Sequence, residues 1–329
     1  MHPKVLLSID GTPVSGTFWS RLVSVTVTDK EGTRSDTIDL VLNAGPPFIE
    51  LPRKKALITC SMGYVETGVA SMGAFTADEI ELSCIPYSIK IQGKSADMRD
   101  TLKEHRERHW DDKTVKDVVS EIASEHGLSA QVSGSVGNLK YKWLAQEGES
   151  ALHFLERLAG RTNALFAIKD GKLIFSEKGA GRTPGGGAVS TLVITPLMIQ
   201  PNSCKVTFAE RESHAKVRAG YHDLAQGART YEEATADPEG QSVYTLRHQY
   251  AGKDEAQAAA GAKAKELQRS ADRTSVTIEG NTGARGGAPM QYAGVHPEVD
   301  NMAWIIETAT HTFSKSAGYT TGVDAKAKI

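Results

Sequence analysis

The sequence predicts a mainly β protein, a β-rich α+β fold, and three observations lead to this class. Aromatic residues make up only 6% of the 329 residues while glycine occurs 31 times, a balance that suits short strands and turns better than a helical bundle. Short stretches of alternating polarity follow one another over residues 4–92, and a second series follows over residues 203–326. The segment between them has helical periodicity, which accounts for the α component.

The first series contains six expected strands with turns at intervals of about 8 to 15 residues, which argues for a barrel or a sandwich. Alternation is clearest at Val23, Val25 and Val27, which are expected to face one way, and in alternate residues from Ile38 to Leu42. Each strand is therefore expected to bury one face. The six expected strands are Lys4–Asp10, Arg21–Thr28, Asp36–Leu42, Ala56–Tyr64, Val65–Ala77 and Glu79–Ile91.

A domain boundary is expected near Gly93, where the pattern changes to helices and a hairpin. A charged helix is predicted near Asp97 to Trp110. A second helix is predicted to start after Thr114 as its N-cap, with Asp117 three residues on, and to end at Gly127 in the C′ position. The apolar residues that give this second helix a buried face are Val115, Val118, Val119 and Ile122.

A third helix and a hairpin follow directly. Ser150 is an expected N-cap for a helix over residues 150–161, because apolar residues then recur at three-and-four spacing. The apolar runs around Phe166 and Ile174 are joined by Asp170-Gly171, which is a strong two-residue signal for a β-hairpin. The apolar positions of the helix are Leu152, Phe154, Leu155, Leu158 and Ala159.

The C-terminal part reads as a second β region. Residues 179–187 are so rich in glycine that they are expected to form a linker or an exposed loop, and residues 281–300 read as a long loop. One helix, Ala-rich and expected over residues 254–270, starts with Asp254 and Gln257 in a capping-box arrangement. The expected strands are Ser203–Glu210, Ala215–Tyr221, Ala228–Ala234, Thr274–Gly280, Met302–Phe313 and Tyr319–Lys326.

Composition excludes several classes of protein. With 38 basic and 40 acidic residues the formal net charge is −2, so the footprint of a dedicated nucleic-acid binder is missing. Cys60, Cys84 and Cys204 are odd in number and contain no CxxC pair, which fits reduced thiols in a protein assembled in a cytoplasm. The N-terminus does not read as a signal peptide, and no segment approaches the length of a membrane span. We therefore expect a soluble protein without membrane insertion.

No residue pattern predicts a catalytic, cofactor-binding or metal site. His105 and His109 are four apart on the predicted helix, but their sequence lacks the His-Glu-x-x-His order and two arginines lie beside them. His222-Asp223 has no accompanying nucleophile motif and reads as a turn. Neighbouring acids on a strand point to opposite faces, so the carboxylate pairs do not predict a glycosidase cleft. These pairs are Asp78-Glu79, Asp111-Asp112 and Glu232-Glu233.

Four segments, taken in order, resemble the phage late control D family, the tail hub proteins of contractile phages. GES-ALHFLERLAGRTNALFAIKDGKLIF is similar to the helix and hairpin of that family, and Val217 to Gly227 is similar to a strand that ends in Tyr-His-Asp. Tyr250 to Ser270 resembles its Ala-rich helix, and Trp304 to Lys326 resembles its closing pair of strands. The resemblance covers most of residues 143–326.

The resemblance implies two antiparallel β-barrels like tail tube domains at residues 1–93 and 181–329, with a small α+β insertion domain at residues 94–180. It implies a homotrimer, because three chains with two barrels each form a pseudo-sixfold ring. Such a ring adapts a hexameric tail tube to a trimeric central spike and leaves a channel for DNA. The implied partners are the spike, the tail tube protein and other baseplate proteins, with the tape measure protein as a further candidate. The implied location is the tail baseplate of a virion, assembled in the host cytoplasm.

Two alternatives remain open at this point. A phage-tail-like bacteriocin or a type VI-like injection machine uses a similar hub, and the sequence does not separate these machines from a phage. A tail-associated peptidoglycan hydrolase belongs to another class, and clearing of purified peptidoglycan would identify it. The resemblance implies no enzyme activity, no cofactor and no specific nucleic-acid binding.

Overall fold

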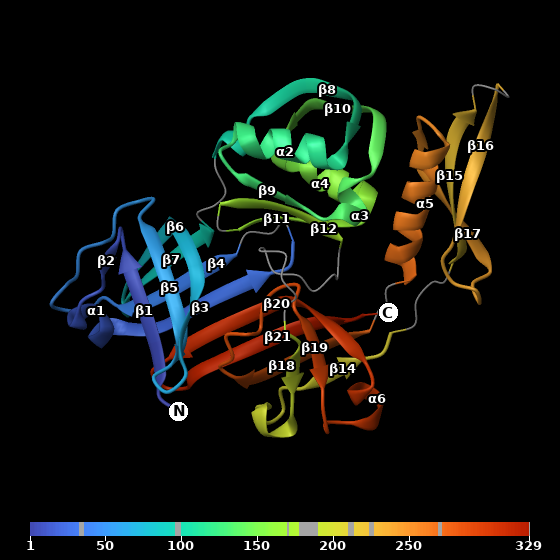
Figure 1. Ribbon diagram of the computed structural model, residues 1–329. Coiled ribbons are helices and arrows are strands. Elements are labelled where there is room, and N and C mark those ends of the chain that lie inside the picture. The colour runs from blue at the N-terminus through green and yellow to red at the C-terminus, as the bar shows by residue number, and fades with distance from the viewer. Residues whose placement is uncertain are drawn as a thin grey trace. The chain divides into compact units, whose positions relative to one another are not determined.

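The chain forms two compact units, each built from segments that are far apart in the sequence (Figure 1). The structure is a computed structural model that describes residues 1–32, 36–95, 100–169, 171–177, 190–209, 214–223, 227–268 and 272–328. Unit 1 comprises Met1–Met98, Val189–Thr207 and Arg273–Lys326. Unit 2 comprises Arg99–Ala188, Phe208–Asp272 and Ala327–Ile329. The predicted linker at residues 179–187 lies outside the described residues.

Unit 1 is built on one large sheet, to which thirteen strands of the described residues belong. Its strand order is β14-β18-β21-β20-β3-β4-β7-β6-β5-β1-β2, and β19 pairs with both β20 and β13. The strands are β1 Pro3–Ile9, β2 Thr12–Pro13, β3 Leu22–Lys30, β4 Thr37–Asn43, β5 Leu57–Tyr64, β6 Gly68–Cys84, β7 Tyr87–Ser95, β13 Leu192–Ile194, β14 Lys205–Thr207, β18 Arg273–Glu279, β19 Pro289–Tyr292, β20 Ala303–Ser314 and β21 Gly318–Lys328. The prediction of a mainly β protein is confirmed.

The sheet joins the two ends of the chain. Strand β20 pairs with β3 in an antiparallel register that sets Thr310 opposite Thr28 and Thr312 opposite Thr26. Alternating apolar residues of β3, β4 and β7 pack with those of β1 and β5 into one buried cluster, because each strand buries one face. The short helices of unit 1 lie in its connections: α1 Gly16–Arg21, η2 Pro196–Met198 and α6 Pro297–Asp300.

Several expectations for the first six strands need correction. Val25 and Val27 are buried, but Val23 is 47% exposed, because the β3–β4 register shifts between Leu22 and Ser24. The expected break at Asp78 is wrong as well. Residues 68–84 form one strand with an irregularity between Ala77 and Glu79, and the chain turns only before Tyr87. The extra residue of this irregularity breaks the alternation of the strand, which makes the sequence pattern resemble a turn.

The residues expected to form a long loop at 281–300 contain two regular elements, β19 and α6. Met290 and Tyr292 of β19 are buried, and the Tyr292 ring lies 6.3 Å from that of Trp304, measured between centroids. The alternating pattern of β19 spans only four residues, which is too short to stand out in a sequence with many glycines. The expectation of a structureless loop was therefore wrong.

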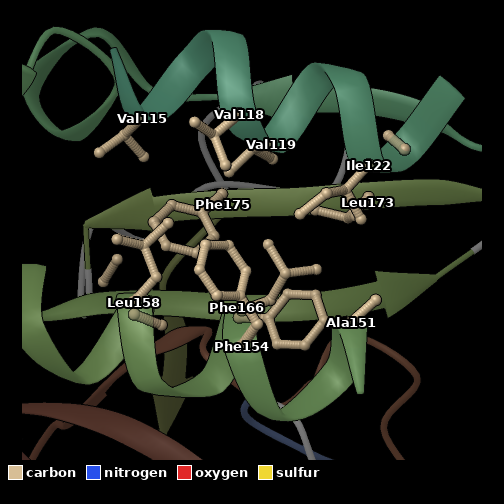
Figure 2. Close-up of a cluster of buried hydrophobic side chains, with 14 of the residues drawn as sticks. Val115, Val118, Val119, Ile122, Ala151, Phe154, Leu158, Phe166, Leu173 and Phe175 are labelled. Atoms are coloured by element: carbon tan, nitrogen blue, oxygen red, sulfur yellow. The ribbon is translucent and has the colours of Figure 1, made fainter. Parts of the chain in front are cut away.

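Unit 2 contains an α+β part whose core is formed between two helices and a small sheet (Figure 2). The sheet has the order β11-β12-β9, and β11 and β12 form the predicted hairpin. Thr114 and Asp117 form a capping box at the start of α2, as predicted, and the side chain of Ser150 caps α4. Residue 170 of the hairpin turn lies outside the described residues. The elements are α2 Val115–Glu125, β9 Ser129–Val132, α3 Gly134–Gly137, α4 Ala151–Thr162, β11 Ala164–Lys169 and β12 Lys172–Glu177.

The charged helix predicted near Asp97 to Trp110 is wrong. A short 3-10 helix, Asp100–Lys103, precedes strand β8, His105–Thr114, which pairs with β10, Lys140–Ser150. The inward positions of β8 include Arg106 and Arg108 as well as Trp110, and the Arg108 guanidinium lies 4.6 Å from the Trp110 ring centroid. Inward and outward side chains therefore alternate along β8 as in other strands. Because two of the inward residues are arginines, the alternation is not visible as a pattern of apolar residues.

The remaining part of unit 2 is a three-stranded sheet covered on one face by a helix. Strands β15 His214–Asp223, β16 Ala228–Thr235 and β17 Ser242–Tyr250 have the order β16-β15-β17, and helix α5, Lys253–Gln268, packs on them. The buried alanines of α5 are the predicted ones: Ala256, Ala259, Ala260 and Ala264. The helix starts one residue before the expected cap, so Asp254 lies in its first turn. The sequence predicts these strands as part of one β region with the C-terminal strands, whereas they form a sheet of their own.

Candidate functional site

The most distinctive surface of unit 1 is the face of the large sheet that points away from its core. On β3 the buried Val25 and Val27 alternate with Ser24, Thr26 and Thr28, which are half-buried. Since successive side chains of a strand point to opposite faces, these hydroxyls lie on the non-core face. We call this surface the hydroxyl face. It includes Ser24, Thr26 and Thr28 of β3, Thr308, Thr310, Thr312 and Ser314 of β20, Thr37 and Asp39 of β4, Ser88, Lys90, Gln92 and Lys94 of β7, and Thr320 of β21.

Cross-strand register places these hydroxyls beside one another. Thr26 lies opposite Thr312 on one side and opposite Asp39 on the other. The hydroxyl oxygens of Thr26 and Thr312 are 3.4 Å apart. The Gln92 amide donates to a carboxylate oxygen of Asp39 at 2.8 Å. The face is therefore an ordered row of short polar side chains.

Three lysines on or beside this face form ion pairs. Lys90 lies 3.7 Å from Asp39, measured from Nζ to Oδ1, and Lys94 lies 2.9 Å from Asp78. Lys326 of β21 pairs with Glu307. Each of these three lysines has a carboxylate within ion-pair distance, whereas Lys30 of β3, which lies opposite Thr308 in the same row, has none among the described residues, so the face carries little unpaired positive charge. A phosphate backbone passing over it would find few free cations to bind.

Below the hydroxyl face, β20 and β21 enclose a buried polar network around His311. The Ala284 carbonyl oxygen can only accept, so His311 Nε2 donates to it, at 3.0 Å. His311 Nδ1 is then the acceptor, and its single lone pair lies 2.9 Å from the Tyr319 hydroxyl and 3.2 Å from the Thr321 hydroxyl, measured from the nitrogen. Burial first, and the nearby positive charge of Arg285 second, lower the pKa of His311 to about 4. The network connects β20 and β21 with the Ala284 carbonyl, and its side chains are buried from solvent.

The histidines considered in the sequence lie apart from one another. His105 and His109 are four residues apart on a strand, which separates their Cα atoms by about 13 Å and is too far for one metal ion. His105 Nδ1 is 2.6 Å from the Gly148 carbonyl oxygen, and His109 Nε2 is 3.4 Å from Asp111. Across the described ranges, no group of three or more His, Cys, Asp or Glu side chains is placed to hold a metal ion.

The paired carboxylates also have separate partners. Asp78 pairs with Lys94, and Asp112 pairs with Lys140 at 3.5 Å. Glu233 pairs with Lys216 and Arg218 on the neighbouring strand, and hydrogen bonds from these two side chains lower its pKa, that from Arg218 most. Tyr221 is buried, while His222 beside it is exposed. The structure brings none of these groups together across a cleft.

The cysteines Cys60, Cys84 and Cys204 are free thiols, as expected. Cys60 is buried in the core of unit 1, but Cys84 is exposed near the turn between β6 and β7. In the part of the chain that the structure describes, no helix has both the length and the apolar character needed to cross a bilayer.

The sequence alone does not identify the hydroxyl face, although the alternation on one of its strands is visible in the sequence. The alternation of Val and Thr in β3 predicts a polar face of hydroxyls. The pairing of β3 with β20, almost three hundred residues later, is not encoded in any local pattern. Register decides which hydroxyls become neighbours.

Comparisons with known proteins agree with one another. Residues 59–317 match the family described as "Phage tail baseplate hub (GPD)". The chain is 30% identical to the "Probable baseplate hub protein" of Escherichia phage 186 and 29% identical to that of Escherichia phage P2. Each alignment covers 100% of this chain and 94% of the relative.

Solved structures share the fold at low sequence identity. The 43 kDa tail protein of prophage MuSo2 from Shewanella oneidensis superposes with a TM-score of 0.69 at 15% identity, covering 98% of both chains. A tail protein from Neisseria meningitidis gives 0.70 at 10% identity, covering 99% of this chain and 97% of that one. A component of the type VI secretion system of E. coli gives 0.57 at 12% identity, covering 98% of this chain and 77% of that one.

Proposed function

Because the chain belongs to the phage tail baseplate hub family, we propose that three copies form a ring at the axis of a contractile tail. The ring adapts a hexameric tail tube above to a trimeric central spike below and leaves a channel for DNA. The role is structural, and no catalytic step is assigned to the chain. Assembly takes place in the host cytoplasm, with which three free thiols are compatible.

The observation that carries this proposal is the hydroxyl face. A channel wall for DNA needs a polar surface that water wets, but it must not hold phosphates by counterion release. Short hydroxyl side chains together with lysines that already have carboxylate partners meet both requirements. We therefore assign the hydroxyl face to the lumen of the ring.

The edges of the large sheet support the formation of a ring. Strand β5 pairs with β6 only up to Thr76, so one edge of β6 from Asp78 to Cys84 pairs with no described strand. At one end of the strand order, β14 pairs with β18 alone among the described strands. Open edges invite strand pairing with another chain. Contact between two different edges is heterologous, and repeated heterologous contacts form a closed ring when the rotation between neighbouring subunits closes.

In this proposal each barrel-like half of unit 1 corresponds to one subunit of the sixfold tube, and closure of the two barrels belongs to the proposal. The expected partners are the spike below and the tail tube protein above, together with other baseplate proteins and the tape measure protein.

A second candidate, the hub of a type VI-like machine or of a phage-tail-like bacteriocin, is favoured by the likeness to the type VI component. Neighbouring capsid and terminase genes would assign the chain to a phage, and their absence would assign it to an injection machine.

The mass of the purified protein in solution tests the ring. Light scattering coupled to size exclusion is expected to give three times the monomer mass for the protein alone, or that mass plus the mass of the spike when the spike protein is added. A chain that stays monomeric at all concentrations, with and without the spike, contradicts the proposal.

A further inference from the structure

Unit 2 carries an acidic surface with an unusual charge arrangement on strands β8 and β10. Glu107 lies directly opposite Glu147 in the antiparallel register, and both are exposed. Like charges directly opposite each other in a sheet are destabilising. Neither carboxylate forms an ion pair within the described ranges. On the same strands Trp143, which is 53% exposed, lies opposite Asp111. We call these four residues the acidic face.

A basic surface lies on strands β15 and β16 of the same unit, on the side of the sheet away from α5. The Tyr231 ring is flanked by two guanidinium groups, Arg229 at 5.0 Å and Arg218 at 5.3 Å from the ring centroid. Arg229 lies across Gly220, where an added Cβ would come within 3.1 Å of its Nε. Arg218 forms an ion pair with Glu233, with 2.7 Å between Nη2 and Oε1. Within the described ranges, Arg229 has no carboxylate partner. Arg218, Arg229 and Tyr231 form what we call the basic face.

The two faces have complementary chemistry. The acidic face offers carboxylates and an exposed indole, and the basic face offers guanidinium groups and a phenol ring. Arginine binds carboxylates with two parallel hydrogen bonds and stacks on the face of tryptophan. Trp, Tyr and Arg are also the residues that most often dominate the energetics of protein interfaces. Among the residues that the structure describes, the acidic face has two carboxylates without an ion-pair partner, and the basic face has one such guanidinium, Arg229. Contact between the two faces would bring these opposite charges together.

We propose that the acidic face of one copy docks on the basic face of the next copy in the hub ring. The inference rests on the proposed ring, and it adds a second contact between subunits, made by unit 2 in addition to the sheet edges of unit 1. The two faces are different surfaces on different sheets, so the contact is heterologous and is satisfied once per subunit around a closed ring.

Charge reversal tests the contact. The double variant E107K/E147K and the single variant R229E are each expected to raise the dissociation constant of the trimer by about tenfold or more, measured by analytical ultracentrifugation. Combining the three substitutions in one chain restores opposite charges across the contact, so the dissociation constant is expected to return toward the wild-type value. Circular dichroism of each variant checks that it is folded. The matched control is Glu156→Lys, an exposed carboxylate of α4 in the same unit, which is expected to leave the trimer unchanged.

The outcomes separate this contact from the ring itself. A wild-type trimer whose stability none of the reversals alters keeps the ring and overturns the contact. Loss of trimer without recovery in the combined variant means that the two faces meet other surfaces, and it overturns their pairing. Reversals that abolish spike binding while the trimer persists assign the faces to the spike instead. A wild-type chain that is monomeric under all conditions contradicts both the ring and the contact.

Discussion

At the scale of single residues, the buried histidine of unit 1 is the best-defined polar feature. His311 is fully buried, and each of its ring nitrogens has a partner when the ring is neutral and Nε2 carries the proton. A proton on Nδ1 would face the Tyr319 and Thr321 hydroxyls instead of finding a carboxylate. Arg285 nearby adds repulsion, although it also pairs with Asp29 at 3.7 Å. The folded protein therefore favours the neutral ring.

This network predicts a loss of stability in acid. The pKa of His311 is about 4 in the folded chain, below its ordinary value of 6.5. Between these two pH values the unfolded chain binds a proton that the folded chain does not, so the free energy of unfolding falls as the pH drops from 6.5 to 4 and levels off below 4. The contribution of His311 to this loss is about 3 kcal/mol. It is measured as the difference between wild type and His311→Gln in denaturant unfolding across this range.

The glutamine variant isolates the histidine because all other titrating groups are the same in both proteins. It is expected to be less stable than wild type at pH 8 and to show a shallower decline between pH 6.5 and 4. Parallel curves for the two proteins would show that His311 does not titrate differently in the folded and unfolded chains.

A glycine next to the same network has a strict steric role. Gly280 donates its backbone N–H to the Tyr319 carbonyl oxygen at 2.9 Å, and a Cβ at Gly280 would overlap the buried Tyr319 ring. Gly280→Ala is therefore expected to lower the free energy of unfolding by about 1–3 kcal/mol. Gly261→Ala in helix α5 is the control, since nothing lies within 4 Å of its added Cβ, and it is expected to stabilise the protein by about 0.5–1 kcal/mol. Equal effects of the two substitutions in thermal unfolding would contradict this account.

At the scale of elements, a helix or strand could be predicted from the sequence when the residues that determine it all lie within that element. Helices α2 and α4 were predictable because their caps and their apolar faces lie within about a dozen residues. Strand β8 was not, because its inward residues Arg106 and Arg108 form ion pairs with Glu125 of helix α2, which lies outside the strand. Strand β6 was divided in two because its bulge near Asp78 resembles a turn. In both cases the residues that determine the structure lie outside the strand: Glu125 of α2 for β8, and the paired strand β7 for β6.

The capping box of α2 gives a prediction at this scale. The Thr114 hydroxyl accepts from the Asp117 N–H at 3.2 Å, and an Asp117 carboxylate oxygen accepts from the Thr114 N–H at 3.1 Å. Thr114→Ala removes the first of these bonds and is expected to lower the free energy of unfolding by about 1 kcal/mol. Ser15→Ala is the comparison, because Ser15 occupies the N-cap of α1 without a side-chain capping bond. A loss at Ser15 as large as that at Thr114, in urea unfolding, would contradict the role of the cap.

At the scale of the whole molecule, the family could be read from ordered segments, but the interaction surfaces could not. The resemblance rests on residues 143–326, whereas the hydroxyl face needs β3 and β4 from the N-terminal part beside β20 from the C-terminal part. The acidic and basic faces likewise depend on register, since Glu107 and Glu147 are forty residues apart in the chain and opposite each other in the sheet. Local sequence patterns do not predict the pairing of strands that are far apart in the chain. The division into residues 1–93, 94–180 and 181–329 stays a prediction.

The central claim is that the hydroxyl face lines the channel of a three-membered hub ring. Electron cryo-microscopy of the assembled protein with its spike, viewed along the threefold axis, tests this claim most directly. The account predicts three copies around the axis, with Thr26, Thr312 and Asp39 of each copy facing an open lumen. A ring whose lumen is lined by other strands, or a hydroxyl face covered by a partner protein, would contradict it.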